Sequence, residues 1–134
     1  MSAEALTRTV AALNDALTRE VINRTVQEHE LEGLDWCWLA LGSEGRGEQT
    51  FATDQDNALV FDVPPARSVD AARERLLAFA REVNAGLDRL GFPLCTGNVM
   101  AGNPDLCLTV DEWQSKFLAW IREPTPQALL NANI

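Results

Sequence analysis

Two aspartates separated by a single residue are the strongest chemical signal in the chain. Asp54 and Asp56 stand directly before an apolar stretch, NALVFD at 57–62. Because side chains alternate between the two faces of a strand, both carboxylates are expected to project from one face. Neighbouring carboxylates repel each other unless a cation lies between them, and hard divalent cations prefer oxygen ligands. The spacing therefore predicts a site for Mg²⁺ or Mn²⁺ at Asp54 and Asp56.

A glycine–serine turn precedes this pair and has the composition of a phosphate site. Gly42 and Ser43 follow the apolar stretch DWCWLAL at 35–41. Gly42 lets the backbone approach a ligand closely, and N–H groups at the start of a helix attract phosphate. The Ser43 hydroxyl can add a hydrogen bond, and Arg46 offers a planar cationic fork for phosphate oxygens. A phosphate-binding turn beside a metal-binding pair predicts chemistry on a nucleoside triphosphate, in which the metal polarises phosphorus and neutralises the departing pyrophosphate.

Three further polar residues are candidates for supporting this site. Glu48 can act as a third acid near the metal, or it can form an ion pair with Arg46. Thr53 and Asn57 flank the aspartates in sequence. The stretch GSEGRG does not match other phosphate loops, since it lacks the Lys-Ser/Thr of a P-loop and the spacing G-x-G-x-x-G.

Composition indicates one globular domain with an acidic surface. The chain has 134 residues, 46% of them hydrophobic, and a formal net charge of −9. This charge argues against nucleic acid as a partner, because binding to a polyanion requires an excess of Lys and Arg. No apolar run is long enough to cross a membrane and no signal-peptide core is visible, so a cytoplasmic location is expected. The three cysteines form no CxxC pair and are expected to be buried and reduced.

Hydrophobic spacing predicts an α/β or α+β arrangement with a small mixed sheet flanked by helices. Helices are expected at 5–28, at 68–90, from the capping box of Thr109 and Glu112 to Pro124, and again after Thr125. Strands are expected at 35–41 and 57–62, and the segment 92–108 is expected to be mostly loop, facing either a cleft or its own packed interior. The first helix has apolar residues at helical period, and the second has a stripe that is expected to be buried. One face of the third helix is also apolar, and its three aromatic residues are expected in the core. These sets are Leu6, Val10, Leu13, Leu17 and Val21; Val69, Ala72, Leu76, Phe79, Val83, Leu87 and Leu90; and Trp113, Phe117, Trp120 and Ile121.

Longer strings strengthen the interpretation. The combination of LGSEGRGEQ at 41–49 with TDQDNAL at 53–59 resembles bacterial nucleotidyltransferases related to the N-terminal domain of PII-protein uridylyltransferase. That family lies within the DNA polymerase beta-like nucleotidyltransferase superfamily. GFPLCTGNVMAGNP at 91–104 and WIREPTPQALLNANI at 120–134 are also similar to segments of the family. The resemblance covers nearly the whole chain.

The resemblance implies a nucleotidyltransferase fold over a single domain, 1–134, that lacks its last strand. It implies that Gly42 and Ser43 hold the triphosphate and that Asp54 and Asp56 bind Mg²⁺. Superfamily members use a third carboxylate on a later strand, and in this family that strand would follow residue 134. The resemblance also implies upstream CBS or cyclic-nucleotide-binding modules in the full-length protein.

Three hypotheses remain open at this stage. The first is an enzyme that transfers a nucleoside monophosphate to a protein or small acceptor, in the manner of a uridylyltransferase. The second is a catalytically inactive module that senses nucleotide or regulates a partner domain. The third is association with itself or another chain through an unpaired sheet edge, which would give a homo-oligomer.

Overall fold

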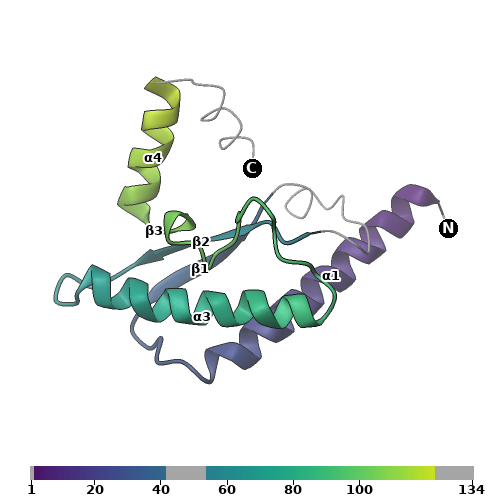
Figure 1. Cartoon of the computed structure of the whole chain (residues 1–134), viewed down its shortest axis with the longest axis horizontal. Coiled ribbons are helices and arrows are strands. Elements are labelled where there is room, and N and C mark those ends of the chain that lie inside the picture. Colours follow the sequence, from purple (N-terminus) through teal and green to yellow (C-terminus); the bar gives the residue numbers. More distant parts are fainter. Residues whose placement is uncertain (1, 42–53, 123–134) are drawn as a thin grey trace.

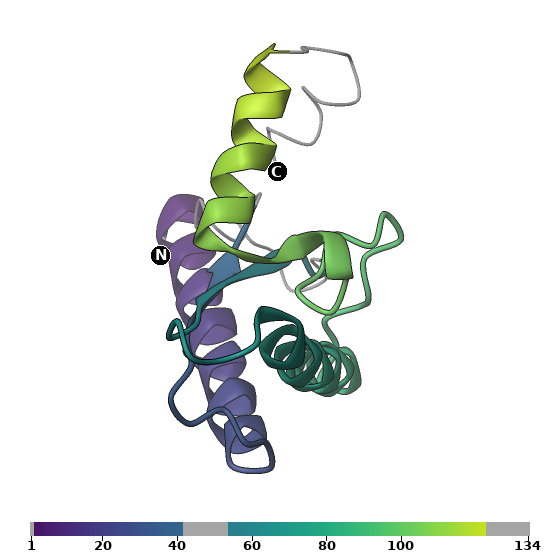
Figure 2. The same ribbon diagram turned by 90° about the vertical axis from the view of Figure 1, so that its left-hand side faces the viewer.

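The computed structural model describes residues 2–41 and 54–122. In this part of the chain, three helices and a small mixed sheet form an α+β arrangement, as predicted. Figures 1 and 2 show α1 and α3 on one side of the sheet, whereas α4 rises from the opposite side. The elements are α1 (Ala3–Val26), β1 (Asp35–Ala40), β2 (Asn57–Asp62), α3 (Val69–Arg89), the 3₁₀ turn η1 (Pro104–Leu106), β3 (Cys107–Thr109) and α4 (Val110–Arg122).

The sheet has the order β1-β2-β3, with β2 in the centre. β1 pairs antiparallel with β2, and β3 pairs parallel with β2. The Leu41 N–H donates to the Asp56 carbonyl over 2.9 Å, so the β1–β2 pairing continues one step beyond the ends of both strands. The expectation of loop over 92–108 is wrong at its end, because Cys107–Thr109 forms β3. Three residues are too few for a strand pattern to be recognised in the sequence.

The core lies between the sheet and the helices α1 and α3. Leu59 and Phe61 of β2 are almost completely buried, and so are Leu76, Phe79 and Val83 of α3. Trp36 and Trp38 pack against this cluster from β1, and the Trp36 ring centroid lies 4.9 Å from that of Phe79. Burying each such side chain contributes about 1.5–3 kcal/mol.

The predicted stripes are only partly buried. On α1, Val10 is buried, but Leu6, Leu13 and Leu17 are exposed by 53%, 54% and 43%. On α3 the stripe is buried except at its two ends, where Val69 and Leu90 are exposed. Helical period identifies the apolar face of a helix, but it does not tell how much of that face another element covers.

The C-terminal end of α1 is held to α3 by a polar contact. The His29 ring nitrogen Nε2 contacts the Glu82 carboxylate. The His29 ring also lies edge-on to the Phe79 ring, with the two centroids 5.8 Å apart. The hydrogen bond from His29 holds the pKa of Glu82 below its ordinary value. The only histidine of the chain therefore has a structural partner.

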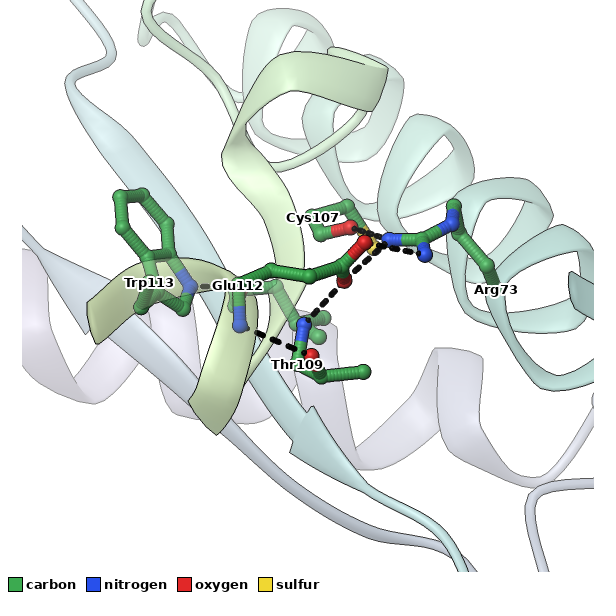
Figure 3. Close-up of polar contacts among 6 residues, drawn as sticks. Arg73, Cys107, Thr109, Glu112 and Trp113 are labelled. Carbon is green, nitrogen blue, oxygen red and sulfur yellow. Dashed lines mark hydrogen bonds and ion pairs between the residues drawn. The ribbon is translucent and has the colours of Figure 1, made fainter. Parts of the chain in front are cut away.

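α4 is fixed to the body of the domain at its first turn (Figure 3). The Arg73 guanidinium of α3 donates to both Glu112 carboxylate oxygens, over 2.9 and 2.8 Å, and to the Cys107 carbonyl over 2.8 Å. Thr109 and Glu112 form the predicted capping box, with the Glu112 N–H donating to Thr109 Oγ1 and the Thr109 N–H donating to Glu112 Oε1. The Trp113 indole N–H donates to the Leu59 carbonyl. These bonds set the direction in which α4 leaves the sheet.

The Arg73–Glu112 pair gives a pH-dependent stability prediction. The hydrogen bond from Arg73, followed by those from Thr109, holds the pKa of Glu112 below its ordinary 4.5. Because the unfolded carboxyl binds a proton more readily, stabilisation is present above pH 4.5 and is lost as the pH falls through the lower folded-state pKa. Glu112→Gln should lower the free energy of unfolding at pH 7 by about 1–2 kcal/mol, since water partly screens the exposed side of the pair.

Urea denaturation at pH 7 and at about pH 3 measures this difference, which should shrink at the lower pH. Glu20→Gln is the matched control, because Glu20 pairs with Arg24 on the exposed face of α1. Its effect should stay below about 0.5 kcal/mol. Equal losses for the two variants would show that Glu112 does not stabilise the attachment of α4.

Candidate functional site

The structure describes three of the eight predicted site residues. Asp54, Asp56 and Asn57 belong to the described part of the chain. The predictions for Gly42, Ser43, Arg46, Glu48 and Thr53 lie outside the described residues, and so does the predicted helix after Thr125. The candidate site is therefore built from the segment that leads into β2 and from what surrounds it.

Exposure alternates along this segment. Asp54 is exposed and Asp56 is half-buried, whereas Gln55 and Asn57 are 4% and 2% exposed. The Gln55 and Asn57 side chains both accept hydrogen bonds from the Asn84 side chain of α3. In an extended segment, neighbouring residues point to opposite sides. The two aspartates therefore lie on the side of the sheet away from α3.

A network of three buried amides holds Gln55 and Asn57 in place. Asn84 Nδ2 donates to Gln55 Oε1 over 2.8 Å and to Asn57 Oδ1 over 3.1 Å. Gln55 Nε2 donates to the carbonyls of Asn84 and Phe92 over 2.8 and 3.0 Å. Buried amides are tolerated only where their hydrogen bonds are made, so this network fixes the position of the segment closely.

The loop after α3 is fixed by the same network. Asn57 Oδ1 accepts from the Ala101 N–H over 2.7 Å, and Asn84 Oδ1 accepts from the Gly102 N–H over 2.9 Å. A Cβ on Gly102 would lie 2.8 Å from Arg81 Cγ and 2.9 Å from Asn84 Oδ1, so only glycine allows the loop to come this close. The backbone also pairs, with the Gln55 N–H donating to the Pro93 carbonyl and the Asn57 N–H donating to the Val99 carbonyl.

A pocket of about 450 Å³ opens on the face of the sheet opposite the core, and neither Asp54 nor Asp56 is among the residues that line it. Leu39 and Leu41 and, from β2, Ala58 and Val60 line its floor. Ala58 and Val60 follow Asp56 at every second position, so all three share one face of the extended segment. Successive same-face residues on a strand are roughly 7 Å apart. The loop contributes Gly97, Asn98, Val99, Asn103, Asp105 and Leu106, and α4 contributes Trp113, Lys116, Phe117 and Trp120.

The α4 stripe differs from its prediction at this pocket. Trp113 is buried as predicted, but Phe117 and Ile121 are 49% and 74% exposed and Trp120 is half-buried. The predicted core placement is therefore wrong for Phe117 and only partly met by Trp120. α4 projects away from the sheet (Figure 2), so only its first turn reaches the core.

Asp54 and Asp56 offer a donor set that suits a small hard cation. Both are carboxylates, the oxygen ligands that Mg²⁺ and Mn²⁺ prefer, and Asp54 is exposed whereas Asp56 is half-buried. Among residues 2–41 and 54–122, no group of three or more His, Cys, Asp and Glu side chains could hold a metal ion. Mg²⁺ is commonly bound by one or two carboxylates together with substrate phosphates, and this pair fits that mode.

The cysteines play no visible part in this site. Burial raises the pKa of the Cys107 thiol to about 11, so Cys107 remains protonated and unreactive. Cys37 is exposed on β1, contrary to the expectation that it is buried. The cysteines of the described part of the chain form no disulfide.

No helix among the described residues is both long and apolar enough to cross a membrane.

Comparison with known proteins identifies the family. Residues 1–127 match the family described as "Putative nucleotidyltransferase DUF294". The chain belongs to this family. No curated protein and no solved structure matches the chain. Membership confirms the resemblance on which the sequence interpretation depended and assigns a nucleotidyltransferase-like function that implies nucleotide binding.

In this DUF294 domain, sequence reasoning did not identify the residues that position the aspartates. Gln55 and Asn84 were not singled out, although both are buried polar residues. Asn84 lies between Val83 and Leu87 on the buried face of α3. A lone Asn on an otherwise apolar helix face was the available signal, because such an amide requires partners.

The network gives a second prediction. Asn84→Leu keeps the approximate size of the side chain but leaves Gln55 Oε1 and the Gly102 N–H without their bonds to Asn84. The free energy of unfolding should fall by about 2–4 kcal/mol, because each unsatisfied buried group costs about 1–3 kcal/mol. Chemical denaturation monitored by circular dichroism measures the loss.

Asn23→Leu is the matched control, since Asn23 is exposed on α1. It should change stability by no more than about 0.5 kcal/mol. If Asn84→Leu were as stable as Asn23→Leu, the amide network would not be what holds the segment in position.

Proposed function

We propose that this domain binds a nucleoside triphosphate with Mg²⁺, or Mn²⁺, through Asp54 and Asp56 and transfers its nucleoside monophosphate to a protein or small acceptor. The observation that supports the proposal is the alternation of exposure along this segment, in which Gln55 and Asn57 are buried while Asp54 is exposed and Asp56 is half-buried. Family membership supports the nucleotidyltransferase part of the proposal. A uridylyltransferase-like choice of UTP and a signalling protein as acceptor rest on the sequence resemblance.

Each residue has a proposed role. Asp54 and Asp56 hold the cation, which when bound neutralises triphosphate charge and polarises the phosphorus under attack. Gly42 and Ser43 bind the triphosphate through backbone N–H groups and the hydroxyl, and Arg46 pairs with its oxygens. Glu48, Thr53 and Asn57 support these groups. For Asn57 the support is positional, because its side chain is engaged with Asn84 and Ala101.

A charged substrate is compatible with an acidic domain only if its charge is compensated. The net charge of −9 repels a free triphosphate at long range. A divalent cation between the aspartates and the phosphates converts this repulsion into attraction. We therefore propose that nucleotide binding by this domain depends on a divalent cation.

Calorimetry tests this proposal with a matched pair of double variants. Asp54→Asn with Asp56→Asn should weaken Mg²⁺-dependent triphosphate binding by at least about tenfold, because each lost carboxylate removes a charged oxygen ligand. Asp35→Asn with Asp62→Asn is the control, since these two aspartates are paired across β1 and β2 at the far end of the same strands. Unchanged affinity in the Asp54/Asp56 variant would contradict the metal role.

The alternative is a nucleotide-sensing or regulatory module without catalysis. It is motivated by the number of proposed ligands, since Asp54 and Asp56 supply two carboxylates whereas the superfamily resemblance implies a third. Transfer from a triphosphate labelled at its α-phosphate distinguishes the two functions. Label on a protein or small acceptor supports transfer, whereas cation-dependent binding without label on any of a panel of acceptors supports the module.

A further inference from the structure

The pocket between α4 and the open face of the sheet has a composition that the proposed metal chemistry does not use. Its floor is aliphatic, with Leu39, Ala58 and Val60 among the residues that form it. One wall is aromatic and comes entirely from α4. Its volume, about 450 Å³, lies within the range of small-molecule sites.

The aromatic wall leaves ring surface accessible. Trp113 is tied to the sheet by its indole N–H bond to the Leu59 carbonyl. The ring centroid of Phe117 lies 6.0 Å from that of Trp113, with an interplanar angle of 31°. It lies 5.0 Å from that of Trp120, with an interplanar angle of 89°. Phe117 is 49% exposed and Trp120 is half-buried, and both line the pocket, so part of their ring surface is accessible there.

The same wall carries the only lysine of the chain. Lys116 Nζ lies 5.7 Å from the Trp120 ring centroid and donates to the Asp105 carbonyl over 2.9 Å. Its side chain is thereby held along the aromatic wall. In a protein with a net charge of −9, this places a positive charge where an anionic aromatic ligand would bind.

The opposite rim supplies a polar group. Asn98 lines the pocket with a left-handed backbone, φ 57°, and its side-chain amide makes no hydrogen bond within the described part of the chain. The side-chain amide of the neighbouring Asn103 is already hydrogen-bonded, since it donates to the Asn98 carbonyl and accepts from the Asp105 N–H. Asn98 can therefore donate to or accept from the edge of a ligand.

We propose that this pocket is the binding site for the base of the nucleoside triphosphate, with Phe117 and Trp120 as stacking surfaces and Lys116 as the cation that favours a nucleotide over a neutral aromatic molecule. The inference rests on the proposed function, because it takes the triphosphate to be held at Asp54 and Asp56. Stacking on aromatic side chains accommodates any base, since every base has a flat π-face. Specificity would then come from a hydrogen bond at the Asn98 edge.

The position of the pocket fits one ligand that spans both sites. Asp56 and Ala58 share a face of the segment, and Ala58 lies in the pocket floor. Same-face residues on a strand are roughly 7 Å apart, so the pocket floor begins one such step from Asp56.

Indole N–H resonances provide a direct test with an internal control. The chain has four tryptophans, of which Trp36 and Trp38 pack on the opposite face of the sheet. Titration with ATP, GTP, CTP or UTP and Mg²⁺ should shift the Trp120 signal and leave those of Trp36 and Trp38 in place. The Trp120 signal is identified by its loss in Trp120→Leu.

Calorimetry on variants then tests the energetics. Phe117→Leu with Trp120→Leu should weaken binding of the preferred triphosphate by about 5- to 100-fold and leave its Mg²⁺ dependence intact. Leu118→Ala and Ile121→Ala are controls on the same helix, because both residues are exposed and neither lines the pocket. Lys116→Met should weaken the binding of the triphosphate and leave the binding of adenosine or uridine unchanged.

The outcomes separate this inference from the proposed function. Wild-type affinity in the Phe117/Trp120 variant, or an unmoved Trp120 signal at saturation, overturns the base site and leaves the metal site standing. If no triphosphate binds, the proposed function fails, and the base site is then tested by titration with nucleosides alone. A shift of the Trp120 signal with a nucleoside supports the base site, and the absence of a shift overturns it. A Trp120 shift that follows protein concentration without nucleotide identifies the wall as a protein contact and also overturns the base site.

Discussion

The hydrogen bonds among Gln55, Asn57 and Asn84 are the constraint on which the candidate site depends. They join the segment before β2, the middle of α3 and the loop after α3 in one buried network. Apolar packing alone would tolerate small shifts of these segments. Buried amides do not, because each group that loses its partner keeps the full cost of desolvation. The network therefore fixes the backbone from which Asp54 and Asp56 project.

The two faces of the sheet differ in what covers them. One face packs against α1 and α3 and supplies the stability of the domain. The other face carries the pocket and is bordered by α4. α4 reaches this position because Arg73 of α3 holds Glu112 in its first turn, so an ion pair beside the sheet aligns the aromatic wall of the pocket. Stability and the shape of the pocket are thus linked through the attachment of a single helix.

Several elements could be predicted from the sequence because their signals are local. The helical period of α3, the capping box of Thr109 and Glu112 and the strand Asn57–Asp62 are all confirmed. The bounds of β1 are also close to their prediction. The strand Cys107–Thr109 was missed, because it is short and exists through its parallel pairing with β2.

Burial was harder to predict than secondary structure. Leu13 and Phe117 both occur in regular apolar stripes, yet both are exposed by about half. A stripe shows what a helix can bury, whereas its neighbours in space decide what it does bury. For the same reason, Gln55 and Asn84 were overlooked, since their partners are distant in the sequence.

The sequence by itself determined the family, the helices with strong period and the adjacent carboxylates, because each of these is written in residues that lie close together along the chain. Only the tertiary structure decided that Gln55 and Asn57 bond to Asn84 in a buried network, and that Phe117 and Trp120 of α4 line a pocket instead of a core. These outcomes depend on hydrogen bonds and packing between segments up to several tens of residues apart, and no local pattern encodes such contacts.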